Sequence, residues 1–239
     1  MKEILTGGRR MSRGVALSLF GAALLLFTPA LGFDFQRDPR WNDAYSKGQR
    51  LYVKNCAACH GRDGEGGLGL PLNLQSFLVV APENYIKKSI LYGRPGRLMP
   101  AFEKMLKPEE VEAIVSFVRS WQFQEGVPVK KGPVKGDPEN GRSLFQGICT
   151  GCHGLNGEGG PAGLGGAHIT STITAARGPA LNNQGFLKSA TDGYIKATLM
   201  YGRVGTPMGA YLKGRQGFVE LTEQEINDIV AFIRSWEKR

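Results

Sequence analysis

Cysteine is scarce in this chain of 239 residues, and its few thiols are not scattered. Four cysteines are present, and all of them lie in two short stretches, "NCAACHG" at 55–61 and "ICTGCHG" at 148–154. In an exported protein, four cysteines would ordinarily suggest two disulfides. The repeated spacing argues against that interpretation, and no cysteine is left over for another purpose.

The sequence also lacks the patterns of several other classes of protein. No stretch keeps up the alternation of apolar and polar residues that a half-buried strand requires, which favours an all-α fold. The basic residues are not interleaved with stacking aromatic residues, which argues against a nucleic-acid-binding surface. With 41% hydrophobic residues, the chain can still bury a substantial core, and its length favours one or two domains.

Residues 1–32 have the composition of an export segment. Basic residues precede an apolar run from Val15 to Phe27, and small residues follow it up to Gly32. This order is typical of a signal peptide that is cleaved after Gly32. The alternative is a retained membrane anchor, because the weakly polar span 14–33 approaches the roughly 20 residues that cross a bilayer. Either a signal or an anchor helix places the rest of the chain in the periplasm or on the outer face of the cytoplasmic membrane.

Each cysteine pair is separated by two residues and followed at once by histidine. The C-x-x-C-H pattern is the attachment signature of c-type haem. Two thiols about one helical turn apart can each form a thioether with a haem vinyl group, and the adjacent histidine can then point its imidazole at the iron. A zinc site and a thioredoxin-like redox pair fit less well, since paired zinc cysteines normally lie closer in sequence and a redox pair belongs among alternating strands and helices. The sequence therefore predicts two covalently attached haem c groups, bound by Cys56, Cys59 and His60 and by Cys149, Cys152 and His153.

The two pentads lie within a longer internal repeat. Gly48 and the first pentad recur 93 positions later, beginning at Gly141. From Asn73 to Met99 the offset is 109 positions, and at the "RSW" tripeptide (119–121) it is 115, so the second copy carries insertions of 16 and 6 residues. Two copies of about a hundred residues are each large enough for a core, which indicates a duplicated domain rather than a solenoid.

The repeat also selects a second ligand for each iron. A methionine sulfur opposite histidine gives the six-coordinate iron of electron-carrying cytochromes. Of six methionines, only Met99 and Met208 coincide under the repeat; Met105 has no counterpart, and Met200 aligns with a leucine. Methionine is usually a core residue, but these two stand in glycine- and proline-rich loops that suit a ligand better. The predicted metal ligands are His60 with Met99 and His153 with Met208.

Each copy begins and ends with helical periodicity. Residues 43–55 and 138–148 lead into the pentads, while 107–122 and 222–238 each carry an apolar stripe and a helix-start signal. In the second of these, the signal is a capping box of Thr222 with Glu225. The terminal helix of each copy is expected to cross its N-terminal helix at the small Gly48 or Gly141. The predicted domains are 40–123 and 137–239, joined by an exposed, proline- and lysine-containing linker at 124–136.

Both copies resemble class I cytochrome c domains, over about Tyr45 to Trp121 and Glu139 to Trp236, and the tandem resembles the two-haem cytochromes of the c4 type. The resemblance implies an all-α pair of tandem domains whose pentad histidine and distal methionine bind iron. It also implies a proline carbonyl that holds the histidine ring by its free N–H. Pro71 and Pro179 are the candidates, although they are one position out of register. The 16-residue insertion includes His168, which we expect to be a surface loop residue, with an alternative ligand as the other interpretation.

The charge of the chain bears on its partners. The formal net charge is +9, and the sequence around Met99 is crowded with basic residues. A basic rim beside an exposed haem edge would steer an acidic redox partner; an ordinary solvated face is the alternative. These basic residues are Lys87, Lys88, Arg94, Arg97, Lys104 and Lys107.

These observations favour a periplasmic dihaem electron carrier that relays single electrons between respiratory proteins. No catalytic residue is proposed, because one-electron transfer requires no proton chemistry. A second hypothesis is the cytochrome c subunit of a membrane-bound oxidoreductase, which a retained anchor would favour. A third is a haem enzyme of the peroxidase or thiosulfate-oxidising type, but such enzymes need a labile position on iron. The paired methionines argue against that.

Overall fold

The computed structural model describes residues 39–130, 132–160, 178–215, 217 and 219–238. Within these ranges the chain forms helices and no strand, with one isolated bridge between Leu212 and Leu221, so the all-α prediction is confirmed. The predicted signal or anchor helix at 1–32 lies outside the described residues, as does His168. Among the described helices, none combines the length and apolar character that crossing a bilayer would demand.

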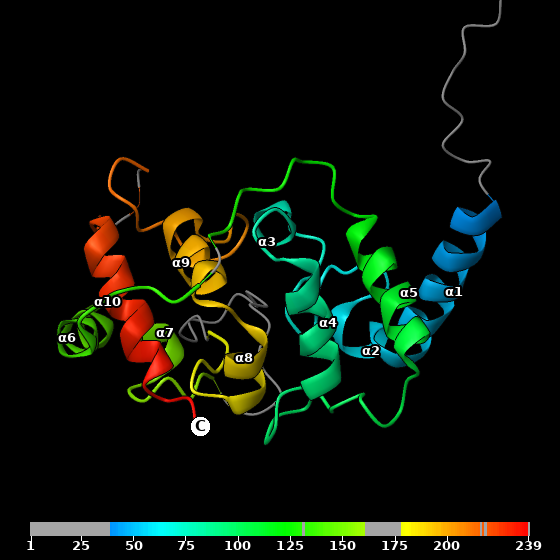
Figure 1. Ribbon diagram of the computed structural model, residues 1–239, viewed down its shortest axis with the longest axis horizontal. Coiled ribbons are helices and arrows are strands. Elements are labelled where there is room, and N and C mark those ends of the chain that lie inside the picture. Colours follow the sequence, from blue (N-terminus) through cyan, green and yellow to red (C-terminus); the bar gives the residue numbers. More distant parts are fainter. Residues whose placement is uncertain (1–38, 131, 161–177, 216, 218, 239) are drawn as a thin grey trace, which may run out of the picture. The chain divides into compact units, whose positions relative to one another are not determined.

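The first copy is built on two crossed helices, α1 (Pro39–Asn55) and α5 (Pro108–Arg119), which pack side by side in Figure 1. Gly48 lies at the crossing, where a Cβ atom would overlap the carbonyl of Ala113. Beside the crossing, the fully buried ring of Tyr52 lies 5.3 Å from that of Phe117. The predicted crossing at Gly48 is confirmed, because only glycine lets the two backbones approach this closely.

The second copy repeats this arrangement with α6 (Pro138–Ile148) and α10 (Glu223–Arg234), shown crossing in Figure 1. A Cβ atom on Gly141 would overlap the carbonyl of Asp228. The predicted capping box at the start of α10 is present: Thr222 Oγ1 accepts from the backbone N–H of Glu225, whose carboxylate accepts from the backbone N–H of Thr222. Local hydrogen bonds therefore fix the start of α10.

Shorter helices complete each copy. The pentads lie on α2 (Ala57–His60) and α7 (Thr150–His153). Each pentad is followed by a short helix, α3 (Gln75–Leu78) or α8 (Gln184–Ser189). A ten-residue helix then leads to the methionine loop; these are α4 (Glu83–Tyr92) and α9 (Asp192–Tyr201). The two longer helices end at glycines with positive φ, Gly93 (56°) and Gly202 (67°), which turn the chain into the methionine loops.

The two insertions of the second copy fall between contacts that both copies share. In the first copy, the backbone N–H of Gly67 donates to the carbonyl of Gly69 at 3.0 Å, with a single residue between them. In the second, the N–H of Gly160 donates to the carbonyl of Gly178 at 3.1 Å, with residues 161–177 between them. The six-residue insertion falls between 211 and 222 and is closed by the bridge of Leu212 with Leu221. Both insertions leave the frame of the repeat intact.

The linker at 124–136 is more closely attached than its sequence suggests. Most of it is exposed, but its three valines pack against the core. The N–H of Val127 donates to the carbonyl of Val79 (2.8 Å) in the first copy, and the N–H of Val134 donates to Asp192 Oδ2 (2.9 Å) in the second. The prediction of an exposed tether is therefore only partly right, because the linker is docked on both copies.

Candidate functional site

The pentads form single helical turns that set the two thiols and the histidine in one geometry. In the first copy, the N–H of His60 donates to the carbonyl of Cys56 at 2.9 Å; in the second, that of His153 donates to Cys149 at 2.9 Å. No disulfide joins any two of the four cysteines, so the disulfide interpretation is wrong. Among the described residues, no three His, Cys, Asp or Glu side chains are grouped to hold a metal ion, which also leaves no shared zinc site.

The first thiol of each pentad is not activated for redox exchange. Burial, reinforced by the second thiol of each pair, raises the pKa of Cys56 and of Cys149 to about 12. A reactive or metal-binding cysteine needs a lowered pKa, because the thiolate is the nucleophile. The thioredoxin-like alternative therefore has no support here.

Each histidine is held by one backbone carbonyl. His60 Nδ1 lies 2.7 Å from the carbonyl oxygen of Leu70, and His153 Nδ1 lies 2.8 Å from that of Pro179. A carbonyl only accepts, so Nδ1–H is the donor and the Nε2 lone pair is left for iron. Burial lowers the pKa of both imidazoles, which favours this neutral form. The expectation for Pro179 is confirmed; that for Pro71 is wrong, since the carbonyl belongs to Leu70.

Two glycines that sequence reasoning missed shape the space beside these rings. A Cβ atom on Gly69 would lie 2.6 Å from the imidazole of His60, and one on Gly178 would lie 2.5 Å from that of His153. Each glycine also donates its N–H, at 2.7 Å, to the carbonyl of the second pentad cysteine. They occupy equivalent positions in the repeat, 109 residues apart. This coincidence is the sequence signal that could have identified both of them.

The methionine loops are equally matched. The N–H of Arg94 donates to the carbonyl of Met99 at 2.9 Å, and that of Arg203 donates to Met208 at 2.8 Å, so each loop closes just around its methionine. Both methionines are half-buried and line the same cavity as the pentads. Met105 is 63% exposed, which agrees with its exclusion as a ligand.

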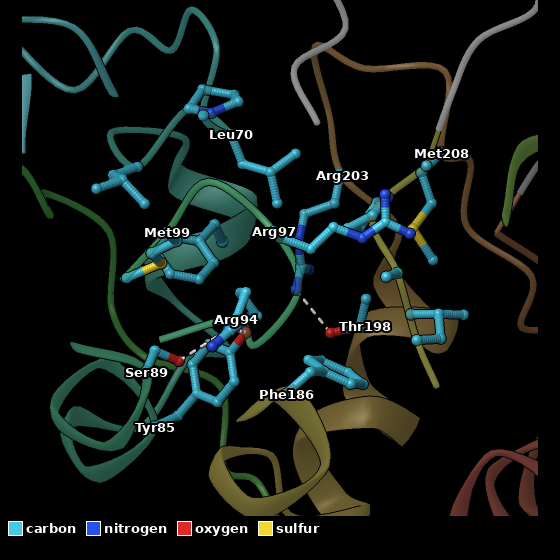
Figure 2. A pocket seen from close by; sticks show the side chains of 18 of the residues that line it. Leu70, Tyr85, Ser89, Arg94, Arg97, Met99, Phe186, Thr198, Arg203 and Met208 are labelled. Atoms are coloured by element: carbon cyan, nitrogen blue, oxygen red, sulfur yellow. Dashed lines mark hydrogen bonds between the residues drawn. The ribbon is translucent and has the colours of Figure 1, made fainter. Parts of the chain in front are cut away.

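One cavity of about 410 Å³ is lined by all eight residues expected to bind haem: both cysteines, the histidine and the methionine of each copy. Three arginines also line it, and Figure 2 shows them with the two methionines: Arg94, Arg97 and Arg203. Among the described residues that line the cavity there is no aspartate or glutamate. Three guanidinium groups in a cavity without a protein carboxylate suit a cofactor that supplies carboxylates itself, as haem does with its two propionates.

The two copies meet through equivalent aromatic residues. Tyr85 of α4 stacks on Tyr194 of α9, its counterpart in the repeat, with ring centroids 3.9 Å apart and planes inclined by 26°. The described residues of both copies belong to one compact unit, and this pair lies within it. Since each residue contacts its own equivalent, the contact is isologous, as at the interface of a two-fold dimer.

Arg94 and Arg203 extend this symmetry. Arg94 donates to Ser89 Oγ (3.1 Å), and its guanidinium lies 5.9 Å from the ring centroid of Phe186 in the other copy. Figure 2 shows the first of these bonds as a dashed line. Arg203 donates to Thr198 Oγ1 (2.6 Å) and lies 5.9 Å from the centroid of Phe77. Each arginine thus contacts both copies at the cavity.

The predicted basic rim is thinner than its sequence suggests. Arg94 and Arg97 line the cavity, and Lys87 pairs with Glu112. Lys104 and Lys107 are exposed and Lys88 is half-buried. Half of the six basic residues are therefore engaged by the protein itself.

Comparison with known proteins agrees with this geometry. Residues 43–118 match the family described as cytochrome c oxidase, cbb3-type, subunit III, and residues 138–237 match the family described as cytochrome c. A cbb3-type cytochrome c oxidase subunit FixP of Bradyrhizobium sp. (strain ORS 278) is 34% identical over 152 residues, which cover 59% of this chain and 50% of that protein.

Two other relatives are similar to the same extent. A FixP subunit of Bradyrhizobium diazoefficiens is 33% identical over 172 residues (67% of this chain, 54% of that protein), and a CcoP subunit of Rubrivivax gelatinosus is 32% identical over 144 residues (57% and 41%). The chain spans about half the length of the curated relatives it matches. The two copies are cytochrome c domains, and the chain is an electron-transport protein that carries two covalently attached haem c groups.

Proposed function

We propose that the chain is the dihaem electron-transferring subunit of a membrane-bound oxidase of the cbb3 class. The relatives named as subunits of such oxidases support this role over a free periplasmic relay and over a carrier of the c4 type. The proposed place is the outer face of the cytoplasmic membrane, with residues 1–32 as export signal or anchor. The proposed partners are the other redox subunits of the complex.

The observation that carries the electron-transfer role is the convergence of two equivalent ligand sets on one cavity. In this proposal, Cys56 with Cys59 and Cys149 with Cys152 attach the two haems. His60 with Met99 would hold the iron of the first haem, and His153 with Met208 that of the second. Each haem c supplies one-electron cycling of its iron between the ferrous and ferric states.

The protein's own contribution is to hold these ligands still. The carbonyls of Leu70 and Pro179 fix the orientation of the imidazoles, and each methionine loop is closed by a backbone hydrogen bond at its arginine. With a histidine and a methionine held for each iron, the haems would keep no position for substrate, so we expect the chain to act as a carrier and the oxygen chemistry to belong to another subunit.

Detergent-solubilised membranes of the native host test the assignment. Native electrophoresis followed by haem staining is expected to place this chain in a band of high mass that also reduces oxygen. A haem-stained band at the mass of the monomer, recovered from the periplasmic fraction without oxidase activity, would favour the free relay.

A further inference from the structure

Arg97 departs from the symmetry of the repeat. Its counterpart in the second copy is Thr206, so no equivalent guanidinium is present there. Arg97 belongs to the methionine loop of the first copy, yet its side chain reaches the second. Nη1 donates to the carbonyl of Gly160 at 2.7 Å, and Nη2 donates to the carbonyl of Glu158.

Both ends of this contact are tied to a proposed iron ligand. On the first copy, the N–H of Arg97 donates to the carbonyl of Arg94 (2.9 Å), and the N–H of Arg94 donates to that of Met99 (2.9 Å). Arg97 is therefore part of the closed loop that presents Met99.

On the second copy, the two carbonyls flank Gly159, whose N–H donates to the carbonyl of His153 at 2.6 Å. The N–H of Gly160 donates to Gly178, and Gly178 lies against the imidazole of His153. A displacement of the segment 158–160 therefore reaches His153 through its backbone and through its ring.

The chemistry of the contact requires arginine. A guanidinium offers several N–H donors in a rigid planar fork, and two of them can bind two carbonyls at once in a fixed direction. Lysine would retain the positive charge beside the cavity but would lose the planar pair of donors that binds both carbonyls. Charge and mechanical link can thus be separated by substitution.

We propose that Arg97 is a positioning residue that couples the two haem sites, linking the loop of the distal ligand Met99 to the loop that holds the proximal ligand His153. The second copy has no counterpart of this link at Thr206, whose hydroxyl donates to the carbonyl of Arg203 within its own loop. The second methionine loop does contact the first copy, but through Arg203 at the carbonyl of Ser76. This inference rests on the ligand assignment of the proposed function.

The experiment uses the full chain, matured with both haems, and compares Arg97→Gln and Arg97→Lys with Lys104→Gln. Lys104 is an exposed basic residue five positions after Met99, so its removal is a matched loss of charge. The readouts are the ferric EPR spectrum and the distribution of one electron between the two haems at half reduction. The EPR signal of the second haem is identified by its loss in Met208→His.

Arg97→Gln and Arg97→Lys are both expected to shift the EPR signal of the second haem and to change the electron distribution by about fivefold, the lower range of allosteric couplings. Lys104→Gln is expected to change neither. Wild-type behaviour of Arg97→Lys would overturn the proposal in favour of a pure charge effect. Changes confined to the first haem in both variants would overturn it in favour of a local role at Met99. A wild-type protein without methionine ligation would instead refute the ligand assignment itself.

Discussion

Tyr85 and Tyr194 occupy equivalent positions in the two cytochrome c domains and stack on each other, with ring centroids 3.9 Å apart. Burial, with Tyr85 as the next cause, raises the pKa of Tyr194 above its ordinary value of 10.0. The contact thus joins the two domains through a phenol whose burial favours its neutral form.

This stack predicts a pH dependence of stability. Above about pH 10 the unfolded chain releases the Tyr194 proton before the folded protein does, so the free energy of unfolding falls as pH rises. Tyr194→Phe removes this contribution, and denaturant titrations between pH 9 and 11 should show a shallower decline than in the wild type. Tyr45→Phe, at a more exposed tyrosine, is the control and should keep the wild-type slope. Equal slopes in all three proteins would contradict the account.

The helix crossing in the second domain predicts opposite effects of the same substitution at two positions of α6. Gly141→Ala places a Cβ on the carbonyl of Asp228 and should lower the free energy of unfolding by about 2 kcal/mol. Gly147→Ala meets open space and should raise it by about 0.5 kcal/mol or more, since alanine favours the helix. Urea unfolding measures both. A tolerated Gly141→Ala would show that the crossing can relax.

The glycine beside the proximal histidine predicts a change in ligation. Gly178→Ala crowds the imidazole of His153, while Gly151→Ala, on the pentad helix itself, meets open space. After maturation with haem, Gly178→Ala should weaken the low-spin EPR signal of the second haem and leave that of the first unchanged. Gly151→Ala should leave both unchanged. A second-haem signal of wild-type strength in Gly178→Ala would be the contrary result.

The ion pair of Asp192 with Arg234 predicts a difference between the two domains. Asp192 Oδ1 accepts from Arg234 Nε at 2.6 Å and its Oδ2 accepts from the linker N–H of Val134, with both side chains of the pair under 20% exposed (14% and 18%). Asp192→Asn should therefore cost about 2 kcal/mol of stability. Glu83→Gln, at the equivalent and exposed position of the first domain, should change stability by less than about 0.5 kcal/mol. Urea unfolding again provides the measurement, and similar losses in the two variants would contradict this assignment.

The features that the sequence predicted correctly are local or repeated. The C-x-x-C-H spacing defines a single helical turn, and the crossing at Gly48 and Gly141 follows from two helical stretches and a small residue between them. The capping box of Thr222 with Glu225 is a four-residue pattern. In the pentad and the capping box, the physical cause lies within a few residues of its effect. The crossing joins residues distant in sequence, and it was predictable because a glycine stands at the equivalent position of each copy.

The features that sequence reasoning missed depend on backbone atoms or on contacts distant in sequence. The carbonyl that holds His60 belongs to Leu70, because any residue supplies a carbonyl and proline is not needed for the bond. The sequence predicts that Arg94 and Arg97 belong to a basic rim beside an exposed haem edge, but both line the cavity, together with residues of both domains. No local pattern distinguishes an arginine that faces solvent from one that reaches a carbonyl more than 60 residues away.

The most direct test of the account is the weak near-infrared absorption of the methionine-to-ferric-iron bond, quantified per haem in the oxidised, fully matured protein. Two closed irons, each with histidine and methionine, predict an intensity that matches two methionine-ligated haems. Intensity for one haem or for none would contradict the symmetric assignment of Met99 and Met208, and with it the description of this chain as a pure electron carrier.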